Sequence, residues 1–437
     1  MDGAAARSVD VPVRTVVASV FGNAMEWYDF FLYGHAAALV FGQVFFPKDS
    51  DPLTATLIAF AGFAIGFLAR PLGAVIFGHV GDRVGRRAAM MWTLFLMGGA
   101  TCLIGALPTY EQVGTLAPAL LLVLRILQGI ATGGEWSGGV LMISENADSR
   151  RRGFWTAWSQ VGVGIGLVLA SAAFYLVNLL PADDFLSWGW RVPFLVSIVI
   201  FGIGIYIRRH LPESREFTEA AGDGKSHALP VLEALRGHWR EILVAVGLRL
   251  AENGGIYVFT AFAITYGKFI GADSGLLLLG VTLGTAVDSV AMLAYGALSD
   301  RVGRLPVYLF GAFAMVALAY PFFWMIGSAS PGIVLLAFVT VIPISHAAMI
   351  GVQPSLLSEM FPTDIRYSGL ALGHEIGSVV AGGLAPVIAT ALLARTHAVW
   401  PIVLYLIGIG ILTAISVVLG SHLARRQASP IATPIRT

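Results

Sequence analysis

Three arginines stand inside apolar stretches of this sequence, where a permanent charge requires a function or a partner. They are Arg70, Arg125 and Arg249. A guanidinium group stays charged in proteins, and its planar fork of N–H donors matches a carboxylate with two parallel hydrogen bonds. We therefore expect Arg125 and Arg249 to grip an organic anion from opposite halves of the chain. Arg70 is predicted to have a structural or gating role.

Both anion-binding candidates belong to polar stripes on predicted helices. Because an α-helix turns by about 100° per residue, Arg125 shares a face with Gln128, and Arg249 shares one with Asn253. From these stripes and a third in the first apolar stretch, we predict substrate contacts by Asn23, Tyr33, Arg125, Gln128, Trp136, Arg249, Asn253 and Tyr257. The alternative is that each arginine is neutralised within its own half, Arg249 by Glu252 for example, and serves only helix packing.

Carboxyl groups in the same stretches are candidates to carry a proton. A buried carboxyl favours its protonated form, and one that meets water or a cation favours ionisation, so its protonation can follow the state of a gate. The candidates, the leading three first, are Glu26, Asp29, Glu135, Asp288 and Glu375. His374 either relays a proton to its neighbour Glu375 or packs at a helix interface. We interpret His35 and His346 as structural.

A charged loop, "GHVGDRVGRR", separates two strongly apolar stretches, and a shorter copy, "GALSDRVGR", occurs later. Such a loop can interlock with neighbouring helices through charge-assisted hydrogen bonds, with its aspartate facing a helix N-terminus. We predict a breakable gate that contains Asp82, Arg83, Arg86, Arg87, Asp300 and Arg301. The alternative is that the arginines only set topology and meet anionic lipid.

The composition indicates a membrane around these groups. Of 437 residues, 57% are apolar and 12% are charged, and the net charge of +1 gives no sign of a nucleic-acid partner. A span needs about 20 apolar residues, and lipid admits only backbones that satisfy their own hydrogen bonds. An all-α membrane protein with twelve spans is predicted from apolar stretches at residues 16–42, 53–80, 88–107, 116–143, 154–180, 190–208, 241–270, 275–298, 305–327, 332–358, 368–394 and 399–420.

A long polar segment divides these stretches into six and six. We expect an N-terminal six-helix bundle at residues 1–208, a cytoplasmic central loop at 209–240 and a C-terminal bundle with its tail at 241–437. Twenty of the 27 lysines and arginines fall on one side of the expected spans and four on the other, so both termini are predicted to be cytoplasmic. The two charged loops are offset by 218 residues, and "SENADSRRRG" returns as "SEMFPTDIRYSG" at an offset of 214, which indicates duplication of a six-helix unit.

The motifs resemble a known family. "GHVGDRVGRR" is similar to the loop motif of the major facilitator superfamily, and the repeat, the central break and the twelve stretches extend the resemblance over nearly the whole chain. Within that superfamily, "GNAMEWYDFFLYG", "RILQGIATGGEWSGG" and "WGWRVPF" resemble the metabolite:proton symporters, which carry α-ketoglutarate, citrate, shikimate, or proline and betaine. The fifth stretch lacks the Gly-Pro motif of many antiporters of the superfamily, which weakens an efflux interpretation.

These observations together predict a proton-coupled symporter that imports a small organic acid by alternating access across the bacterial inner membrane. The alternatives are a symporter or exchanger of zwitterions or osmolytes and, more distantly, a transporter-like membrane sensor. Neither an HExxH nor a suitably placed GxSxG pattern is present, so we expect no enzyme activity. We also expect no cofactor and no metal. The expected partners are the organic acid, protons and lipid, and the expected oligomeric state is a monomer.

Overall fold

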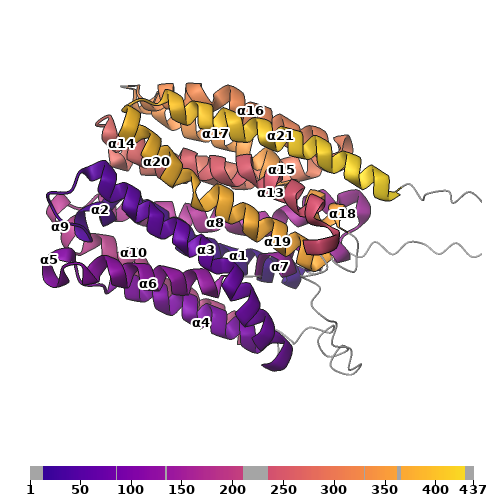
Figure 1. The fold of residues 1–437 in the computed structure, drawn as a ribbon, viewed down its shortest axis with the longest axis horizontal. Coiled ribbons are helices and arrows are strands. Elements are labelled where there is room, and N and C mark those ends of the chain that lie inside the picture. Colours follow the sequence, from indigo (N-terminus) through magenta and orange to yellow (C-terminus); the bar gives the residue numbers. More distant parts are fainter. Residues whose placement is uncertain are drawn as a thin grey trace, which may run out of the picture.

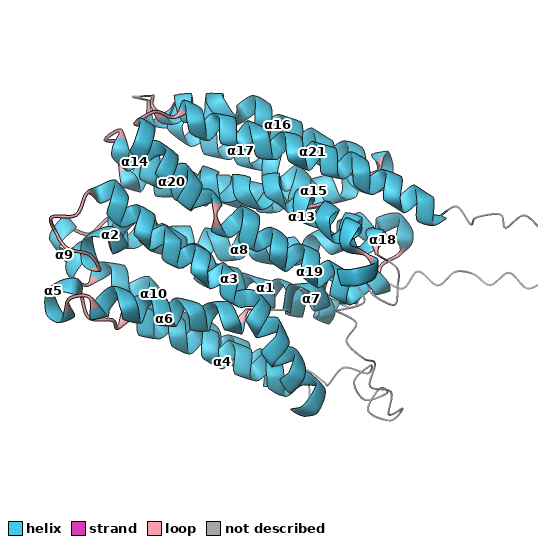
Figure 2. Ribbon diagram, in the orientation of Figure 1, coloured by secondary structure: helices cyan, strands magenta, loops and turns pink. Residues whose placement is uncertain are grey.

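The described part of the chain is helical throughout. A computed structural model describes residues 13–84, 86–132, 135–209, 235–328, 330–361 and 366–428. Helices joined by short connections account for nearly all of them, and no strand occurs in these ranges (Figure 2). This matches the all-α prediction, because a chain that crosses lipid must satisfy its backbone groups within each segment.

The first half of the chain, described up to Arg209, contains the helices that carry the predicted arginines Arg70 and Arg125. Its elements are α1 (Val13–Ala36), η1 (Ala37–Phe41), α2 (Gly42–Val44), α3 (Pro52–Val84), α4 (Arg86–Gly105), α5 (Tyr110–Val113), α6 (Leu116–Ala131), α7 (Glu135–Asn146), η2 (Ser149–Arg151), α8 (Arg152–Asn178), α9 (Ala182–Ser187), η3 (Gly189–Arg191) and α10 (Val192–Arg209).

The second half, described from Leu235, contains Arg249 on its first long helix. Its elements are α13 (Trp239–Tyr257), η4 (Val258–Phe262), α14 (Ala263–Phe269), α15 (Ser274–Val302), α16 (Arg304–Ile326), α17 (Pro331–Ile350), α18 (Gln353–Met360), α19 (Arg366–Gly377), η5 (Ser378–Gly383), α20 (Ala385–Thr396) and α21 (Trp400–Ala428). Among these elements, η1, η4 and η5 are short π-helical segments, a distortion often found at functional sites.

Eight described helical segments are long and apolar enough to cross a membrane: 52–77, 152–178, 239–269, 274–302, 304–326, 331–360, 368–396 and 400–421. Three shorter apolar helices, 91–105, 116–131 and 189–204, coincide with parts of the third, fourth and sixth predicted stretches. The first predicted stretch is helical from Val13 to Val44 but carries Glu26 and Asp29 near its middle. Most described residues of every predicted stretch are therefore helical.

Helices of the first half lie together on one side of the molecule, and those of the second half lie on the other (Figure 1). Along the border between them, α8 packs on α15 over most of their length. At one end of the molecule α7 contacts α18 and α19, and nearer the opposite end α3 contacts α20. At that opposite end the Lys268 ammonium donates to the backbone carbonyls of Ala38 and Leu39, at 3.4 and 3.0 Å. The two sides therefore touch at both ends.

Glycine permits a close approach between α3 and α6. A Cβ atom added at Gly129 would overlap the backbone carbonyl of Gly66, and one added at Gly73 would overlap that of Ile130. The two helices can approach so closely because these positions carry no side chain, as is common in membrane helix pairs. This approach sets the positions of Arg70 on α3 and Arg125 on α6.

We predict that Gly129→Ala lowers the apparent melting temperature of the detergent-solubilised protein. The added methyl group must push two tightly packed helices apart, and overpacking of this kind costs about 1–3 kcal/mol. Gly99→Ala and Gly202→Ala are matched controls, because a Cβ at either position meets no atom within 4 Å. Equal losses in all three variants would contradict the proposed close packing.

Candidate functional site

The guanidinium of Arg125 is fully buried in a cage of aromatic rings. Its Cζ atom lies 4.3 Å from the ring centroid of Phe30, 4.5 Å from that of Tyr33 and 4.9 Å from that of Phe63. Such contacts favour a cation over a ring face, and they are stronger away from water. The cage joins α1, α3 and α6, so the first half alone positions this arginine.

Arg125 has no direct carboxylate partner among the described side chains. Its Nη1 donates to Gln128 Oε1 at 3.2 Å, whereas Nε and Nη2 have no hydrogen-bond partner there. A buried donor without an acceptor costs roughly 1–3 kcal/mol, and more when the group is charged. An acceptor from outside the chain would remove this cost, and the two free N–H groups belong to the planar fork that binds a carboxylate bidentately.

A chain of hydrogen bonds connects Arg125 to Asp29. The amide of Gln128 accepts from Arg125 and donates to Thr101 Oγ1 at 2.7 Å, and the Thr101 hydroxyl lies 2.6 Å from Asp29 Oδ2. Asp29 and Arg125 are both buried. The carboxylate therefore balances the arginine through two neutral side chains instead of through an ion pair.

Arg249 lies in a hydrogen-bonded network within the second half, in which both Nη groups are paired and Nε has no partner among the described residues. Its Nη1 donates to Glu252 at 2.9 Å and to Gln353 at 2.8 Å, and its Nη2 donates to Ser378 at 2.8 Å. Ser378 begins the π-helical segment η5. The structure thus places Arg249 in the ion pair with Glu252 that the sequence raised as an alternative to substrate binding.

Arg70 connects the two halves of the chain. Its guanidinium donates to Glu26 on α1 at 3.0 Å and to Glu375 on α19 at 2.6 and 3.2 Å. All three side chains are buried. The contact continues through His374, which lies 3.1 Å from Glu375 and stacks on the Trp136 ring at 3.8 Å between centroids. Two halves of the molecule therefore meet at one buried cation.

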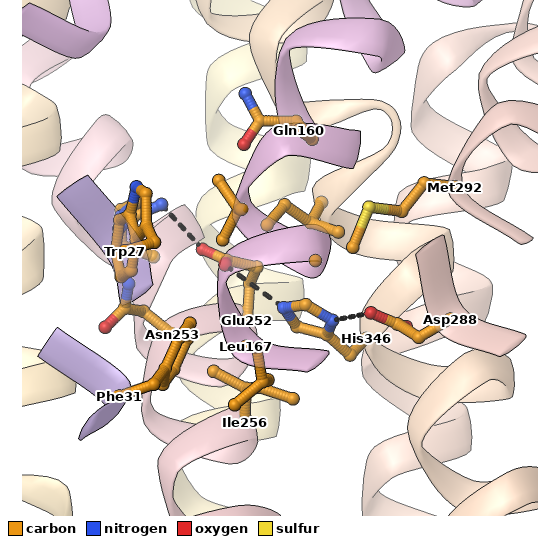
Figure 3. A pocket seen from close by; sticks show the side chains of 14 residues that line it. Trp27, Phe31, Gln160, Leu167, Glu252, Asn253, Ile256, Asp288, Met292 and His346 are labelled. Atoms are coloured by element: carbon orange, nitrogen blue, oxygen red, sulfur yellow. Dashed lines mark hydrogen bonds and ion pairs between the residues drawn. The ribbon is translucent and has the colours of Figure 1, made fainter. Parts of the chain in front are cut away.

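A small cavity lies between α1 and α8 on one side and α13, α15 and α17 on the other (Figure 3). Its volume of about 10 Å³ is roughly the space of one water molecule. The wall includes Trp27, Asn253 and Arg249 but not Arg125. This space, which we call the chamber, is too small for an organic acid, and described helices of the two halves touch at both ends of the molecule.

His346 lies on the wall of this cavity between two carboxylates (Figure 3). Its Nδ1 is 2.8 Å from Asp288 Oδ2, and its Nε2 is 3.5 Å from Glu252 Oε1. The same Glu252 also accepts from Arg249. Asp288, one of the proton-carrying candidates, is therefore paired with a histidine that the sequence suggested to be structural.

The remaining predicted contacts fall into two groups. Asn23 donates to the backbone carbonyl of Ser159 at 2.7 Å and Tyr33 to that of Ala59 at 3.3 Å, so both already hold helices together. Asn253 Oδ1 and the Tyr257 hydroxyl are buried and have no partner among the described residues. The Tyr257 ring lies between the halves, with centroids 5.4 Å from Phe31 and 5.1 Å from Phe63.

One copy of the charged loop can be described in detail. Asp300 accepts from the backbone N–H groups of Gly153 at 2.8 Å and Phe154 at 2.9 Å, at the start of α8, and it also pairs with Arg304. Arg301 is exposed. The backbone turns at Gly303, where φ is +96°, a conformation that favours glycine. The side chains of Glu135, Asp82, Arg83, Arg86 and Arg87 lie outside the described residues.

Sequence reasoning did not select Thr101 or Gln353. Gln353 is an amide inside a strongly apolar stretch, as Gln128 is, so its residue type was a usable signal. Thr101 gave no such signal, because a threonine can satisfy its hydroxyl on its own helix. Here the hydroxyl also lies 2.9 Å from the backbone carbonyl of Met97. Its place in the connection to Asp29 depends on the register between α1, α4 and α6.

Comparison with known proteins identifies the family. The model of the Major Facilitator Superfamily matches residues 20–374. The shikimate transporter of Escherichia coli K12 is 39% identical over 412 residues, 93% of this chain and 94% of the relative. The proline/betaine transporter of Salmonella typhimurium is 34% identical over 442 residues, 97% of this chain and 87% of the relative.

This chain belongs to the major facilitator superfamily. It is a multi-pass membrane transporter, and the resemblance to the metabolite:proton symporters is confirmed. The expectation that it is a transport protein and not an enzyme is confirmed by the same relatives. A crystal structure of a D-xylose-proton symporter shares its fold, with a TM-score of 0.71, 18% identity and coverage of 94% of this chain and 97% of that protein.

For the contact at Arg70 we predict that substitutions of Arg70 and Glu375 have strongly non-additive effects on the free energy of unfolding. Arg70→Gln leaves two buried carboxylates without their cation, and breaking a buried pair in this way costs about 3–5 kcal/mol. The double variant Arg70→Gln/Glu375→Gln removes one of the two charges and recovers part of that loss. Unfolding in denaturant measures all four proteins of the cycle. Additive losses would contradict a direct interaction.

For the second charged loop we predict that Asp300→Asn opens the end of the molecule at α7 and α18. The substitution removes the negative charge at the N-terminus of α8 and the pair with Arg304. Spin labels at Arg151 and Val302, in a Cys102→Ser background, report the opening as an increased distance. Arg301→Gln, at the exposed neighbour, is the control. An unchanged distance distribution in Asp300→Asn would show that Asp300 is not part of the closure.

Proposed function

We propose that this protein is a proton-coupled symporter that imports a small organic anion, such as a mono-, di- or tricarboxylate, by alternating access. The anion binds at Arg125 as the chamber opens, and the proton is carried by a carboxyl group of the same half. The observation that supports this most is a fully buried arginine with two free N–H groups and no carboxylate partner among the described side chains.

The hydrogen-bonded chain from Arg125 to Asp29 suggests how the two fluxes are coupled. When no anion is bound, Asp29 balances the charge of Arg125 through Gln128 and Thr101. An incoming carboxylate takes over that balance, which leaves Asp29 as a buried negative charge with less compensation. Protonation of Asp29 then becomes favourable, because burial penalises an uncompensated charge. Anion and proton are consequently bound together.

For the architecture we propose twelve spans in two six-helix bundles, at residues 1–208 and 241–437, with a cytoplasmic connection at 209–240 and both termini cytoplasmic. The contact between Ser144 and Ser358 supports a two-fold relation. Their hydroxyls lie 3.2 Å apart, and their separation of 214 residues equals the offset of the sequence repeat. Equivalent positions touch each other at a two-fold axis. We place the protein in the bacterial inner membrane.

The relatives support both a carboxylate and a second class of cargo. A shikimate transporter agrees with an anion site, and a proline/betaine transporter raises the alternative of a zwitterion or osmolyte. Trp27 and Phe31 on the cavity wall could face a quaternary ammonium group. The anion is favoured because the strongest aromatic cage already holds the protein's own cation, Arg125.

We predict that a carboxylate raises the melting temperature of the purified protein and that Arg125→Ala abolishes the rise. A ligand at about 100 times its Kd stabilises the folded state by about 2.7 kcal/mol. A thermal-shift screen of shikimate, citrate, α-ketoglutarate, proline and betaine measures the effect. Arg125→Lys keeps the charge but loses the fork, so we expect weaker binding by about tenfold or more.

Arg191→Ala is the control for this experiment. Arg191 donates to the backbone carbonyls of Gly105 and Leu107, away from the chamber, so its loss lowers stability without changing the ligand-induced rise. A rise that persists in Arg125→Ala would contradict the anion site. Stabilisation by proline or betaine alone would favour the alternative cargo. Binding without transport into proteoliposomes would favour a sensor.

A further inference from the structure

The histidine on the chamber wall has a carboxylate on each side. His346 comes from α17, Asp288 from α15 and Glu252 from α13, so three helices converge on one imidazole (Figure 3). All three side chains are buried, and all three line the cavity between the halves. This arrangement exposes the imidazole to the space where cargo and water enter when the chamber opens.

With Asp288 and Glu252 ionised, the charges around His346 balance when the imidazole is protonated. Arg249 on α13 pairs with Glu252, which leaves the charge of Asp288 without a permanent cation in the cluster. From α16, the Tyr308 hydroxyl faces the cluster through Gln353, a neutral amide that α18 contributes. With a neutral imidazole the cluster carries one net negative charge in a buried place, and a proton on His346 removes it. Burial of an uncompensated charge is costly.

His346 differs from His35, another buried histidine of the same molecule, in the charge of its hydrogen-bond partners. His35 is equally buried, but its Nε2 bonds to the neutral hydroxyl of Ser171 at 2.8 Å and its Nδ1 has no partner among the described residues. A metal ion is not the explanation for His346 either, because no group of three histidine, cysteine or acidic side chains in the described residues is suited to hold one.

We propose that His346, between Asp288 and Glu252, is a second proton-binding site of the transport cycle. The inference rests on the proposed function and adds to it a proton carried by the second half of the chain. The imidazole holds its proton while the chamber is closed. When the chamber opens toward the cytoplasm, water solvates Asp288 and Glu252. A net negative charge on the cluster then costs less free energy, and the proton dissociates from His346. One anion then enters with two protons, one on each half.

The experiment measures how anion accumulation depends on the proton gradient. Proteoliposomes contain the purified full-length protein, the membrane voltage is clamped at zero with potassium and valinomycin, and radiolabelled shikimate is the probe. Each coupled proton contributes a factor of ten in accumulation per pH unit. We expect about a hundredfold accumulation per pH unit for the wild type and about tenfold for His346→Gln.

His35→Gln is the matched control and keeps the wild-type dependence. Asp288→Asn removes the partner carboxylate and gives the same reduced dependence, so it replaces His346→Gln if that variant does not fold. An unchanged dependence in His346→Gln overturns the second proton site and leaves the symporter proposal intact. A wild type that moves shikimate without any response to the gradient overturns the symporter proposal itself.

If the wild type does not move shikimate, the protonation of His346 decides the question. In protein labelled with ¹⁵N-histidine, the signal that is lost in His346→Gln belongs to His346. We expect its chemical shift to be that of an imidazolium at neutral pH, while that of His35 is neutral. A neutral His346 at every pH between about 5 and 8 contradicts the proposal.

Discussion

The structure around the chamber depends on how the charges of buried ionised side chains are offset by ion pairs and hydrogen bonds. A buried charge costs several kcal/mol unless a partner or hydrogen bonds offset that cost. Arg70, Arg125 and Arg249 are all fully or almost fully buried, and each meets this requirement differently. Arg70 takes two carboxylates from opposite halves, Arg249 takes one from its own helix, and Arg125 is balanced only through an amide and a hydroxyl. The differences give the three arginines different tasks.

These tasks follow the requirements of alternating access. A transporter alternates between two conformations, each closed at a different end of the chamber, and their free energies must lie within a few kcal/mol of each other. The contacts between its halves must therefore be breakable. An ion pair such as Arg70 with Glu375 suits this, because water can solvate both groups when the chamber opens. The network that pairs both Nη groups of Arg249 lies within one half and has no need to break. Arg125 is also confined to one half, but its free N–H groups favour an external anion.

The helices and most of the buried charged residues could be predicted from the sequence, because membrane spans impose a simple pattern. Long apolar stretches predicted the helices, and ionisable residues inside these stretches predicted which side chains lie near the chamber. The partners could not be predicted in the same way. Helical spacing shows that Arg249 and Glu252 can meet within one helix, but the meeting of Arg70 with Glu375, 305 residues later, depends on how α3 and α19 pack. His346 appeared structural because both carboxylates that contact it come from other helices.

Anion binding by Arg125 is tested most directly by an experimental structure of the protein with shikimate bound, or with whichever carboxylate raises the melting temperature most. We expect a carboxylate group on Nε and Nη2 of Arg125, with the rings of Phe30 and Phe63 moved to admit it. A bound carboxylate held elsewhere, with Arg125 still enclosed by its aromatic rings, would show that this arginine is not the anion's partner.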